Sequence, residues 1–543
     1  MSKIAFDWGT EVTRSGGPIP FLQYSPRRRR VAELLLDAER WRDRVHLIQG
    51  SRRLTFGDLF LASGRVAGRL VEQGLNPGDR LLLLAPNSPE WVTAFWAGIR
   101  AGAIVTLGNG WWNRAEAEHA VKLVQPSVVI ADEKRRELLP SSLTDNQVVL
   151  VDQVRRWGEA DSIPTPAAAG GDENDPAVIV FTAGTTGDPK AAVLSHRSVI
   201  ANLHSLLLVS GRLPQQLDPG KRGAVVLQSG PMFHIGGIQA LLLAMLCGHS
   251  MVFLEGRFDA GQVLELIERE HVTVWGAVPT MAFRVLEHPS LAGRDLSAVR
   301  SISLGGAAVQ PELTARLRRA FGGADRGLST IYGMTETGGT VASASGQLMA
   351  EHPRTSGKPT PVSELRIDSP SPGGEGEILV RTPGQMLGYW GQPQADIIDG
   401  EGWVRTGDLG RIEDGLLYVT GRSKDIIIRG GENIASAHVE SALLRHPAVR
   451  NAAVVARPDA DLGERVGAAI ELDPSTPVSA QDLAEFGRTH LANHEVPTDW
   501  WLMTDQLPMT EAGKVDKRKL SASWPSGLAV RTDSQPAKPP PPR

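Results

Sequence analysis

Cysteine is nearly missing from this sequence, with one residue, Cys247, among 543. A single cysteine forms no disulfide within the chain and supplies no cluster of thiolate ligands for a metal. The first twenty residues, Met1–Pro20, also lack the apolar core and cleavage site of a signal peptide. This usage of cysteine is typical of an intracellular protein, and we predict a cytoplasmic location.

Long apolar runs and an excess of one charge are lacking as well. The longest apolar stretches, such as Ile238–Cys247, fall short of the roughly 18 to 20 residues of a membrane span, so we expect no integral membrane segment. With 57 basic and 61 acidic residues, the net charge of −4 creates no general attraction to nucleic acid or anionic lipid. The run Arg27–Arg30 is a local exception, interpreted either as a phosphate or lipid contact or as a solvated face at the start of a helix over 31–41. We therefore expect small partners bound at a local site.

Strand-length apolar runs alternate with helix-period segments through the first two thirds of the chain. This alternation is typical of β-α-β units and predicts parallel sheets in an α/β fold. The predicted strands are 80–84, 103–107, 177–181, 224–228, 250–254, 272–275 and 299–304, and the predicted helices are 60–72, 90–101, 199–208, 237–246, 262–270 and 311–321.

The pattern changes beyond residue 365. Short strands with Gly and Asp turns indicate a small antiparallel or barrel-like segment, and a compact α+β unit follows Gly421. We predict a large N-terminal α/β domain over 1–421, which includes the barrel-like segment, and a small mobile α+β domain over 422–525. The Pro-rich tail 526–543 buries too little apolar surface to become ordered. Whether the protein forms a homodimer is left open.

The segment Phe181–Lys190, FTAGTTGDPK, follows a predicted buried strand. Its glycines let the backbone approach an anion, its threonines donate hydroxyls and Lys190 adds a charge, so it indicates a phosphate-binding loop. It is not a Walker sequence, because Ala191 stands where the Mg²⁺-binding hydroxyl would follow Lys190. A Gly/Thr-rich turn without a ligand is the structural alternative.

Two further segments carry side chains that suit a functional site. Ile331–Gly338, IYGMTETG, offers an aromatic face, hydroxyls and a carboxylate, which can stack on a base and hold Mg²⁺ through its water shell; its alternative is a polar turn. Pro231–Gly237, PMFHIGG, places His234 at the entrance to an apolar helix, where a structural histidine is the alternative.

Seven segments in chain order together resemble the adenylate-forming superfamily of acyl-CoA synthetases, luciferases and peptide-synthetase adenylation domains. They are TAGTTGDPK (182–190), PMFHIGG (231–237), SLGGAA (303–308), YGMTET (332–337), GWVRTGDLG (402–410), GRSKDIIIRGGENI (421–434) and PMTEAGKVDKRKL (508–520). The resemblance implies a two-step reaction with ATP, Mg²⁺ and CoA. A carboxylic acid attacks the α-phosphate of ATP to give acyl-AMP and pyrophosphate, and the CoA thiol then displaces AMP to give a thioester.

The resemblance also implies roles for individual residues of the large domain. The implied nucleotide contacts are Thr182, Gly184, Thr185, Thr186, Gly187 and Lys190 in the phosphate loop, Gly306, Ala307, Ala308, Tyr332 and Gly333 around adenine, Thr335 at the α-phosphate, Glu336 on Mg²⁺ directly or through water, and Asp408 and Arg422 at the ribose. His234 is similar to the gate between the acyl pocket and the CoA tunnel.

Three positions of the predicted small domain match the family as well. Lys514 resembles the lysine that bridges the substrate carboxylate and the α-phosphate, and its alternative is a solvated charge. Lys424 resembles the hinge about which the small domain swings between the two steps. Gly431 matches the glycine beside the pantetheine tunnel, where a side chain would narrow the path of the thiol.

Departures from the family pattern leave the acceptor and the acid open. Ala183 and Ala191 replace a common serine and glycine, and Ala435–His438 replaces a common aromatic-Pro-x-Glu run. The resemblance therefore supports ATP as a substrate more strongly than CoA. His234 stands where an α-amino acid would need an acidic residue, so we expect an aliphatic or aryl acid without an α-amino group. The alternatives are a fatty-acyl-AMP ligase that passes the acyl group to a carrier protein and a catalytically silent nucleotide-binding homologue; luciferase-like oxidation is a remote third.

Overall fold

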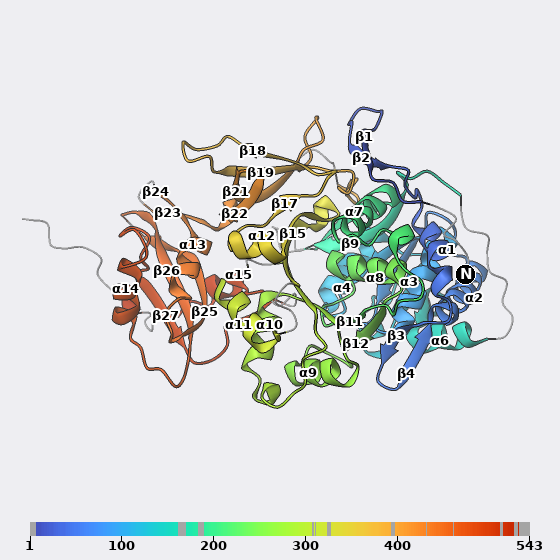
Figure 1. Cartoon of the computed structure of the whole chain (residues 1–543), viewed down its shortest axis with the longest axis horizontal. Coiled ribbons are helices and arrows are strands. Elements are labelled where there is room, and N and C mark those ends of the chain that lie inside the picture. Colours follow the sequence, from blue (N-terminus) through green and yellow to red (C-terminus); the bar gives the residue numbers. More distant parts are fainter. Residues whose placement is uncertain are drawn as a thin grey trace, which may run out of the picture. The chain divides into compact units, whose positions relative to one another are not determined.

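The computed structural model describes residues 7–160, 170–182, 189–306, 309, 311–322, 327–392, 397–429, 432–459, 461–510, 514–525 and 530–531 (Figure 1). By packing, the chain forms two compact units. The first comprises Met1–Val309, Leu313–Arg366 and Leu379–Thr406, and the second Gln310–Glu312, Ile367–Ile378 and Gly407–Arg543. The domain limits expected at residues 421 and 525 stay predictions. No helix in these ranges is both long and apolar enough to cross a membrane.

The first unit contains a seven-stranded sheet whose central strands are parallel. In spatial order the strands are β20 (Gly388–Tyr389), β10 (Lys190–Ser195), β9 (Pro176–Thr182), β6 (Ile104–Leu107), β5 (Arg80–Leu84), β7 (Val128–Ala131) and β8 (Val148–Leu150). Strand β10 runs antiparallel to β9, and β20 runs antiparallel to β10. Neither β10 nor β20 was among the strands expected from the sequence, and both extend one edge of the sheet.

A nine-stranded sheet forms the other half of this unit. Its strands are, in order, β17 (Lys358–Pro359), β16 (Gly339–Ser345), β15 (Leu328–Met334), β14 (Ser301–Leu304), β13 (Val274–Ala277), β11 (Val225–Gln228), β12 (Ser250–Phe253), β3 (Val45–Gln49) and β4 (Arg52–Thr55). Neighbours from β15 to β3 run parallel, and the strands at either edge are antiparallel. The predicted α/β fold with parallel sheets is confirmed.

Helices pack between the two sheets and on their outer faces. The helices are α1 (Leu34–Ala38), α2 (Phe56–Glu72), α3 (Pro89–Ala101), α4 (Arg114–Val124), α5 (Glu133–Arg136), α6 (Val151–Glu159), α7 (His196–Val209), α8 (Ile235–Cys247), α9 (Ala260–Arg269), α10 (Pro279–Glu287), α11 (Pro311–Ala320) and α12 (Gly346–Glu351). Both α3 and α7 contact strands of the two sheets. The single helix expected over 31–41 is instead three short pieces, with α1 between two 3-10 turns.

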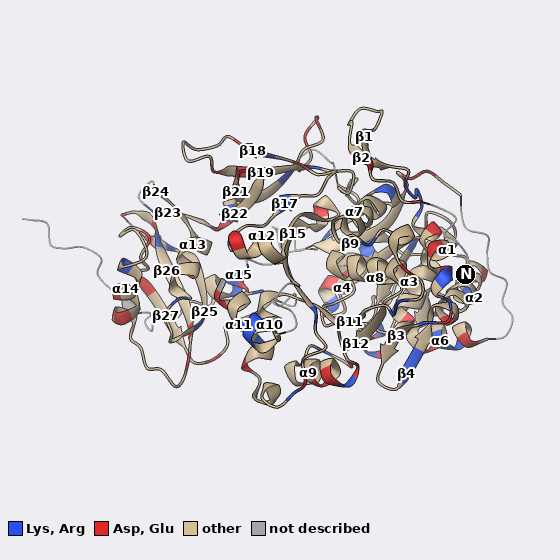
Figure 2. Ribbon diagram, in the orientation of Figure 1, with Lys and Arg blue, Asp and Glu red and all other residues tan. Residues whose placement is uncertain are grey.

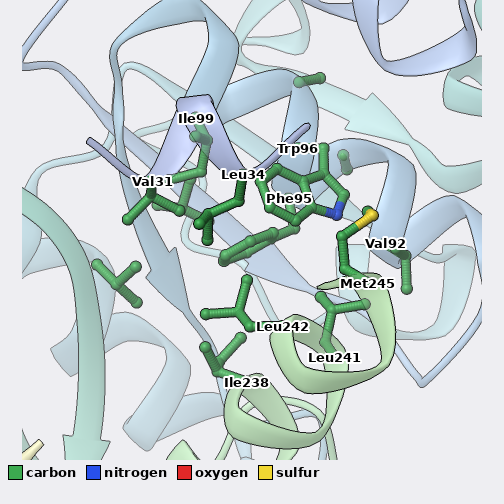
Figure 3. Close-up of a cluster of buried hydrophobic side chains, with 14 of the residues drawn as sticks. Val31, Leu34, Val92, Phe95, Trp96, Ile99, Ile238, Leu241, Leu242 and Met245 are labelled. Atoms are coloured by element: carbon green, nitrogen blue, oxygen red, sulfur yellow. The ribbon is translucent and has the colours of Figure 1, made fainter. Parts of the chain in front are cut away.

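The strand β5 shows how sequence alternation builds these layers. Leu81 and Leu83 point into the core shared with α3 and α8, whereas Leu82 and Leu84 point into a second core with α4. Side chains alternate faces along a strand, so a strand buried on both faces has a continuous apolar sequence. Figure 3 shows the first core, where Phe95 and Trp96 of α3 meet Leu241 and other residues of α8.

The second unit contains the predicted α+β fold. Its six-stranded sheet comprises β24 (Glu432–Ala435), β23 (Ile426–Arg429), β26 (Gly463–Leu472), β27 (Asp499–Met503) and β28 (Val530–Arg531), with β25 (Val449–Asp459) also paired to β26; its helices are α13 (Ser436–Leu443), α14 (Ala480–Arg488) and α15 (Lys517–Ala522). The expected barrel-like segment is a four-stranded sheet of β18 (Glu364–Asp368), β19 (Gly376–Arg381), β21 (Val404–Glu413) and β22 (Leu416–Arg422).

The charged residues do not gather by sign. Figure 2 shows acidic and basic residues side by side on α9 and on other helices, which matches the small net charge. Most of the Arg27–Arg30 run is neutralised locally: Arg27 pairs with Glu173 at 2.6 Å, Arg28 with Asp37, and Arg30 with Asp175 at 3.5 Å. Three of the four arginines therefore tie the N-terminal segment to its neighbours, whereas Arg29 is exposed.

Four histidines of the first unit are buried: His46, His196, His204 and His249. Burial lowers the pKa of the first three to about 4 and that of His249 to about 3. In the unfolded chain they take up protons near pH 6.5, so the folded state loses stability as the pH falls from 6.5 toward 4. Each such histidine contributes about 3 kcal/mol to this loss, since one pKa unit corresponds to about 1.4 kcal/mol.

We expect the variant His46→Asn to melt at a lower temperature than the wild type at pH 7.5 but to lose less of its melting temperature between pH 7.5 and 4.5. The imidazole of His46 lies 2.8 Å from the carbonyl of His249, a contact that an asparagine amide can replace without titrating. Scanning calorimetry at a series of pH values checks this. The exposed His271, changed to Asn as a control, should leave the slope unaltered. An equal slope in His46→Asn and the wild type would contradict the assignment.

Candidate active site

A short strand at the edge of the seven-stranded sheet gathers three of the predicted site residues. The hydroxyl of Tyr389, on β20, donates to Oε1 of Glu336 at 2.7 Å and also shares a side-chain hydrogen bond with Thr182, the last residue of β9. Nζ of Lys190, the first residue of β10, lies 5.1 Å from the centre of the Tyr389 ring. Carboxylate, hydroxyl and ammonium groups from separate strands therefore converge on one tyrosine.

Glu336 lies in a 3-10 turn, Thr335–Thr337, that follows the end of β15. The turn is held by hydrogen bonds of the Thr337 hydroxyl to the backbone of Met334, and the amide of Met386 donates to the carbonyl oxygen of Glu336 at 3.0 Å. The side chain of Glu336 is 7% exposed. In the described part of the chain, no group donates to its second oxygen, Oε2, so this oxygen remains open to a ligand.

The donor set around Glu336 fits Mg²⁺. Across the residues that the structure describes, no three His, Cys, Asp or Glu side chains come together as a metal cage. Mg²⁺ usually binds proteins through one or two carboxylates and completes its shell with water and substrate phosphates. The carboxylate of Glu336, joined through Tyr389 to Thr182 and Lys190, meets that requirement.

The described residues among those predicted around adenine lie near the ends of neighbouring strands. Tyr332 and Gly333 directly precede Met334, the last residue of β15, and Gly306 follows β14, which pairs with β15. Gly306 has φ +79, a conformation that side chains other than glycine rarely adopt. At Gly333 a Cβ would lie 1.9 Å from the carbonyl oxygen of Gly339, so glycine is required there too.

His234 is the N-cap of α8, which begins at Ile235. Its ring centre lies 4.6 Å from that of the buried Phe233, and Phe233 meets Trp111 edge-to-face at 5.1 Å. Trp112 is buried and packs on Phe181.

A small cavity of about 10 Å³ lies between α7, α8 and Gly338, which follows the turn that contains Glu336. The cavity is lined by Val199, Asn202, Leu203, Ile235, Ile238, Gln239, Leu242 and Gly338. Two carboxamides interrupt this apolar lining. Nε2 of Gln239 donates to Oδ1 of Asn202 and to the Thr340 hydroxyl, the latter at 3.1 Å, and Nδ2 of Asn202 donates to the Thr340 carbonyl at 2.9 Å.

In the second unit, Asp408 and Arg422 lie opposite each other on β21 and β22. Their side chains form an ion pair of 2.8 Å, in which Asp408 is buried and Arg422 is exposed. The antiparallel register therefore brings together two residues that are 14 positions apart in the sequence.

Lys514 lies at the end of a turn closed by a bridge between Met509 and Val515. The amide of Lys514 donates to the Thr510 hydroxyl at 3.2 Å. Burial lowers the pKa of Lys514, the charges of Arg422 and Lys424 lower it further, and Asp408 opposes them. Although its side chain reaches solvent, Lys514 is thus within electrostatic range of the Asp408–Arg422 pair.

The predicted hinge, Lys424, lies in a short 3-10 turn, Ser423–Asp425, directly after β22. The unusual Ala435–His438 segment begins α13, and the hydroxyl of Ser436 donates to the carbonyl of Asp425 at 2.5 Å. Seven predicted site residues lie outside the described residues: Gly184, Thr185, Thr186, Gly187, Ala307, Ala308 and Gly431.

A family model described as AMP-binding enzyme matches residues 35–390, which is well over half of the chain. This chain belongs to the AMP-binding enzyme family. A second model, described as AMP-binding enzyme C-terminal domain, matches residues 438–514. The protein is an adenylate-forming ligase close to the acyl-CoA synthetases, as the seven segments indicated.

Individual relatives of this AMP-binding enzyme differ in what their names describe. A feruloyl-CoA synthase of an Amycolatopsis species is 33% identical over 477 residues, which cover 86% of this chain and 93% of that protein. A fatty acid–acyl-carrier-protein ligase of Streptomyces coeruleorubidus is 30% identical over 492 residues, covering 86% and 91%. The structure of an o-succinylbenzoate CoA synthetase from Bacillus subtilis, in complex with its acyl-adenylate intermediate, is 29% identical and superposes with a TM-score of 0.77, covering 92% and 99%.

Sequence reasoning missed Tyr389 and the pair Asn202–Gln239 in this AMP-binding enzyme. Tyr389 lies 53 residues from Glu336 in a strand of two residues, too short to show a periodic pattern. Gln239 could have been noticed as a polar residue within the apolar segment that became α8.

Proposed function

We propose that this AMP-binding enzyme is an AMP-forming acyl-CoA synthetase. A carboxylate oxygen of the acid forms a bond to the α-phosphorus of ATP, pyrophosphate leaves, and the CoA thiol then attacks the acyl carbon and releases AMP. The observation that carries the proposal is the buried carboxylate of Glu336, joined through Tyr389 to Thr182 and Lys190 on either side of the 183–188 segment.

The proposed contacts of the nucleotide follow from the chemistry of each group. Lys190 and Thr182, with the loop between them, offer a cation and a hydroxyl to the β- and γ-phosphates. Thr335 offers its hydroxyl to the α-phosphate, and the Tyr332 ring offers a face to adenine. The carboxylate of Asp408 accepts hydrogen bonds from the ribose hydroxyls, and its ion pair with Arg422 orients it.

Glu336 would hold the magnesium ion of MgATP through Oε2, directly or through water. Bound there, the ion would neutralise phosphate charge as the leaving pyrophosphate gains it. The chain's own contribution is to hold that oxygen in place.

Lys514 supplies the cation that lets the acid carboxylate approach the α-phosphate, two groups that otherwise repel each other. Gly431 leaves room for the pantetheine arm, Lys424 provides the hinge between the two steps, and His234 separates the acyl site from the thiol. His234 also excludes the acidic partner that an α-ammonium group would need.

The helix α8 supports a proposal for the acid itself. From His234 to Gln239 the helix rises about 7.5 Å, at 1.5 Å per residue. A cavity of about 10 Å³ beside the two carboxamides accommodates one oxygen-sized group. We infer an acid whose tail is largely apolar and ends in a hydrogen-bonding group, such as a hydroxylated aryl acid; a feruloyl-CoA synthase among the relatives supports this choice.

A carrier-protein acceptor is the second candidate. The Ala435–His438 segment departs from the family pattern where the acceptor is presented, and a carrier-protein ligase is 30% identical to this chain. The same adenylate would form in either case, and the acceptors can be compared directly.

Purified protein should exchange labelled pyrophosphate into ATP when offered hydroxycinnamic, phenylpropanoic, octanoic or hexadecanoic acid, and should then form a thioester with free CoA. Mass spectrometry distinguishes acyl-CoA from acyl-AMP and from an acylated phosphopantetheine carrier protein. If a thioester forms only with the carrier protein, the acceptor is the carrier protein and not CoA. No exchange with any acid would contradict the proposed function.

The variant Lys514→Ala should lower the rate of pyrophosphate exchange by about 10²- to 10³-fold, the typical loss when one positioned charge is removed from a transition state. Formation of acyl-CoA from supplied acyl-AMP should change little, because that step does not join two anions. Lys519→Ala, which removes an exposed lysine of α15, is the matched control and should affect neither step. Equal losses in both steps would argue against this role of Lys514.

The variant Gln239→Leu should lower the preference for 4-hydroxycinnamic over cinnamic acid by about tenfold. The preference is the ratio of kcat/KM for the two acids, in which a general loss of stability cancels. Gln347→Leu, on the exposed face of α12, serves as the control and should leave the ratio unchanged. If the ratio is unchanged in Gln239→Leu, the carboxamides do not contact the acid.

A further inference from the structure

Tyr389 connects parts of the chain that are far apart in sequence. It lies on β20, the two-residue strand that pairs with β10 through Ala192↔Tyr389 and Val193↔Gly388. The backbone of the flanking segment is also fixed, since the amide of Leu387 donates to the Val193 carbonyl at 2.8 Å. The ring therefore has a defined position relative to β10, whose first residue is Lys190.

The Tyr389 hydroxyl satisfies a buried carboxylate. A buried carboxylate requires hydrogen-bond donors in place of the water it has lost, and a hydroxyl donor to an ionised group is among the stronger neutral partners. The donor–acceptor distance of 2.7 Å to Oε1 of Glu336 is that of a well-formed O–H···O bond. The tyrosine hydroxyl is the donor in this contact, because a carboxylate oxygen accepts.

The contact uses only one of the two carboxylate oxygens. With Oε1 held by Tyr389 and the Glu336 backbone held by Met386, the orientation of the carboxylate is restricted, while Oε2 has no donor among the described residues. Restricting a ligand's rotation before the metal arrives reduces the entropy lost on binding.

The same ring lies beside both described ends of the predicted phosphate loop. Thr182 shares a hydrogen bond with the Tyr389 hydroxyl, and the Lys190 ammonium lies 5.1 Å from the ring centre, within the range of a cation–π contact. The three polar partners of Tyr389 are the same residues that the resemblance to the family assigns to the triphosphate and its metal ion. This coincidence favours a role in the site over a purely structural one.

We propose that Tyr389 is a positioning residue that orients Glu336 for the magnesium ion of MgATP and aligns it with Thr182 and Lys190. This inference rests on the proposed function, because it takes the metal and phosphate roles of Glu336 and Lys190 from it. Tyr389 itself touches neither the metal nor the reacting atoms; it acts through the three residues that it contacts.

The test is the variant Tyr389→Phe, which keeps the ring and removes the hydroxyl. The Mg²⁺ concentration that gives half of the maximal pyrophosphate exchange should rise by about 10-fold, within the 10- to 100-fold range typical of residues that orient metal ligands. At saturating Mg²⁺, the rate should recover to within a few fold of the wild type. The calorimetric affinity for ATP with Mg²⁺ should fall, while the affinity for ATP in EDTA should change little.

Tyr24→Phe is the matched control. The Tyr24 side chain is 1% exposed, and its hydroxyl is hydrogen-bonded to the Ser205 hydroxyl at 3.1 Å, so the same deletion removes a buried hydroxyl away from the site. It should lower the melting temperature without moving the Mg²⁺ midpoint. A Tyr389→Phe variant that lowers only the melting temperature, with the wild-type midpoint and wild-type MgATP affinity, would overturn the inference.

A double variant separates orientation from a general disturbance of the site. Once Glu336 is changed to Gln, the effect of Tyr389→Phe on the Mg²⁺ midpoint should fall from about 10-fold to less than twofold, because the oriented carboxylate is gone. Independent, multiplicative effects would count against the proposal. If the wild type shows no exchange with any acid, the proposed function fails instead; the comparison of ATP affinity with and without Mg²⁺ still decides the role of Tyr389.

Discussion

A buried carboxylate needs hydrogen-bond donors in place of the water it loses, and at Glu336 this requirement ties together two distant segments of the first unit. The replacement comes from Tyr389, whose hydroxyl bonds to one oxygen and leaves the other open. For the tyrosine to reach that oxygen, the chain must return to the edge of the seven-stranded sheet as β20, 53 residues after Glu336. The short antiparallel edge is thus part of the site and more than a continuation of the sheet.

The groups proposed for the nucleotide and those proposed for the acid belong to different parts of the fold. Thr182 and Lys190 lie at the ends of strands, and Glu336 lies in the turn after β15. The carboxamides of Asn202 and Gln239 lie on α7 and α8. With this separation, the helices proposed to bind the acid could change without disturbing the proposed phosphate contacts, and relatives of this chain are named for acids as different as ferulic acid and fatty acids.

The role proposed for the second unit rests on the charges around Lys514. Lys514 is affected by Arg422 and Lys424, which disfavour its charge, and by Asp408, which favours it. Three cations near one carboxylate leave an excess of positive charge, and a polyanionic nucleotide would balance it.

The amino-acid sequence by itself determined the α/β fold, many of its central strands and longer helices, and the superfamily. Strand β5 is an example: its unbroken leucines specify burial on both faces, and that information is local. The seven segments did the same for the reaction class, because each motif is contiguous. The expected helix over 31–41 was wrong in form, since three short pieces replace it there.

Only the tertiary structure decided which residues support those motifs. Tyr389 meets Glu336, and Asn202 meets Gln239, through sheet pairing and helix packing that no sequence period encodes. The pairing of Asp408 with Arg422 likewise depends on the register of β21 against β22. Hydrophobic periodicity reports how a segment is buried, whereas the partner of a buried polar group depends on which distant segment packs against it.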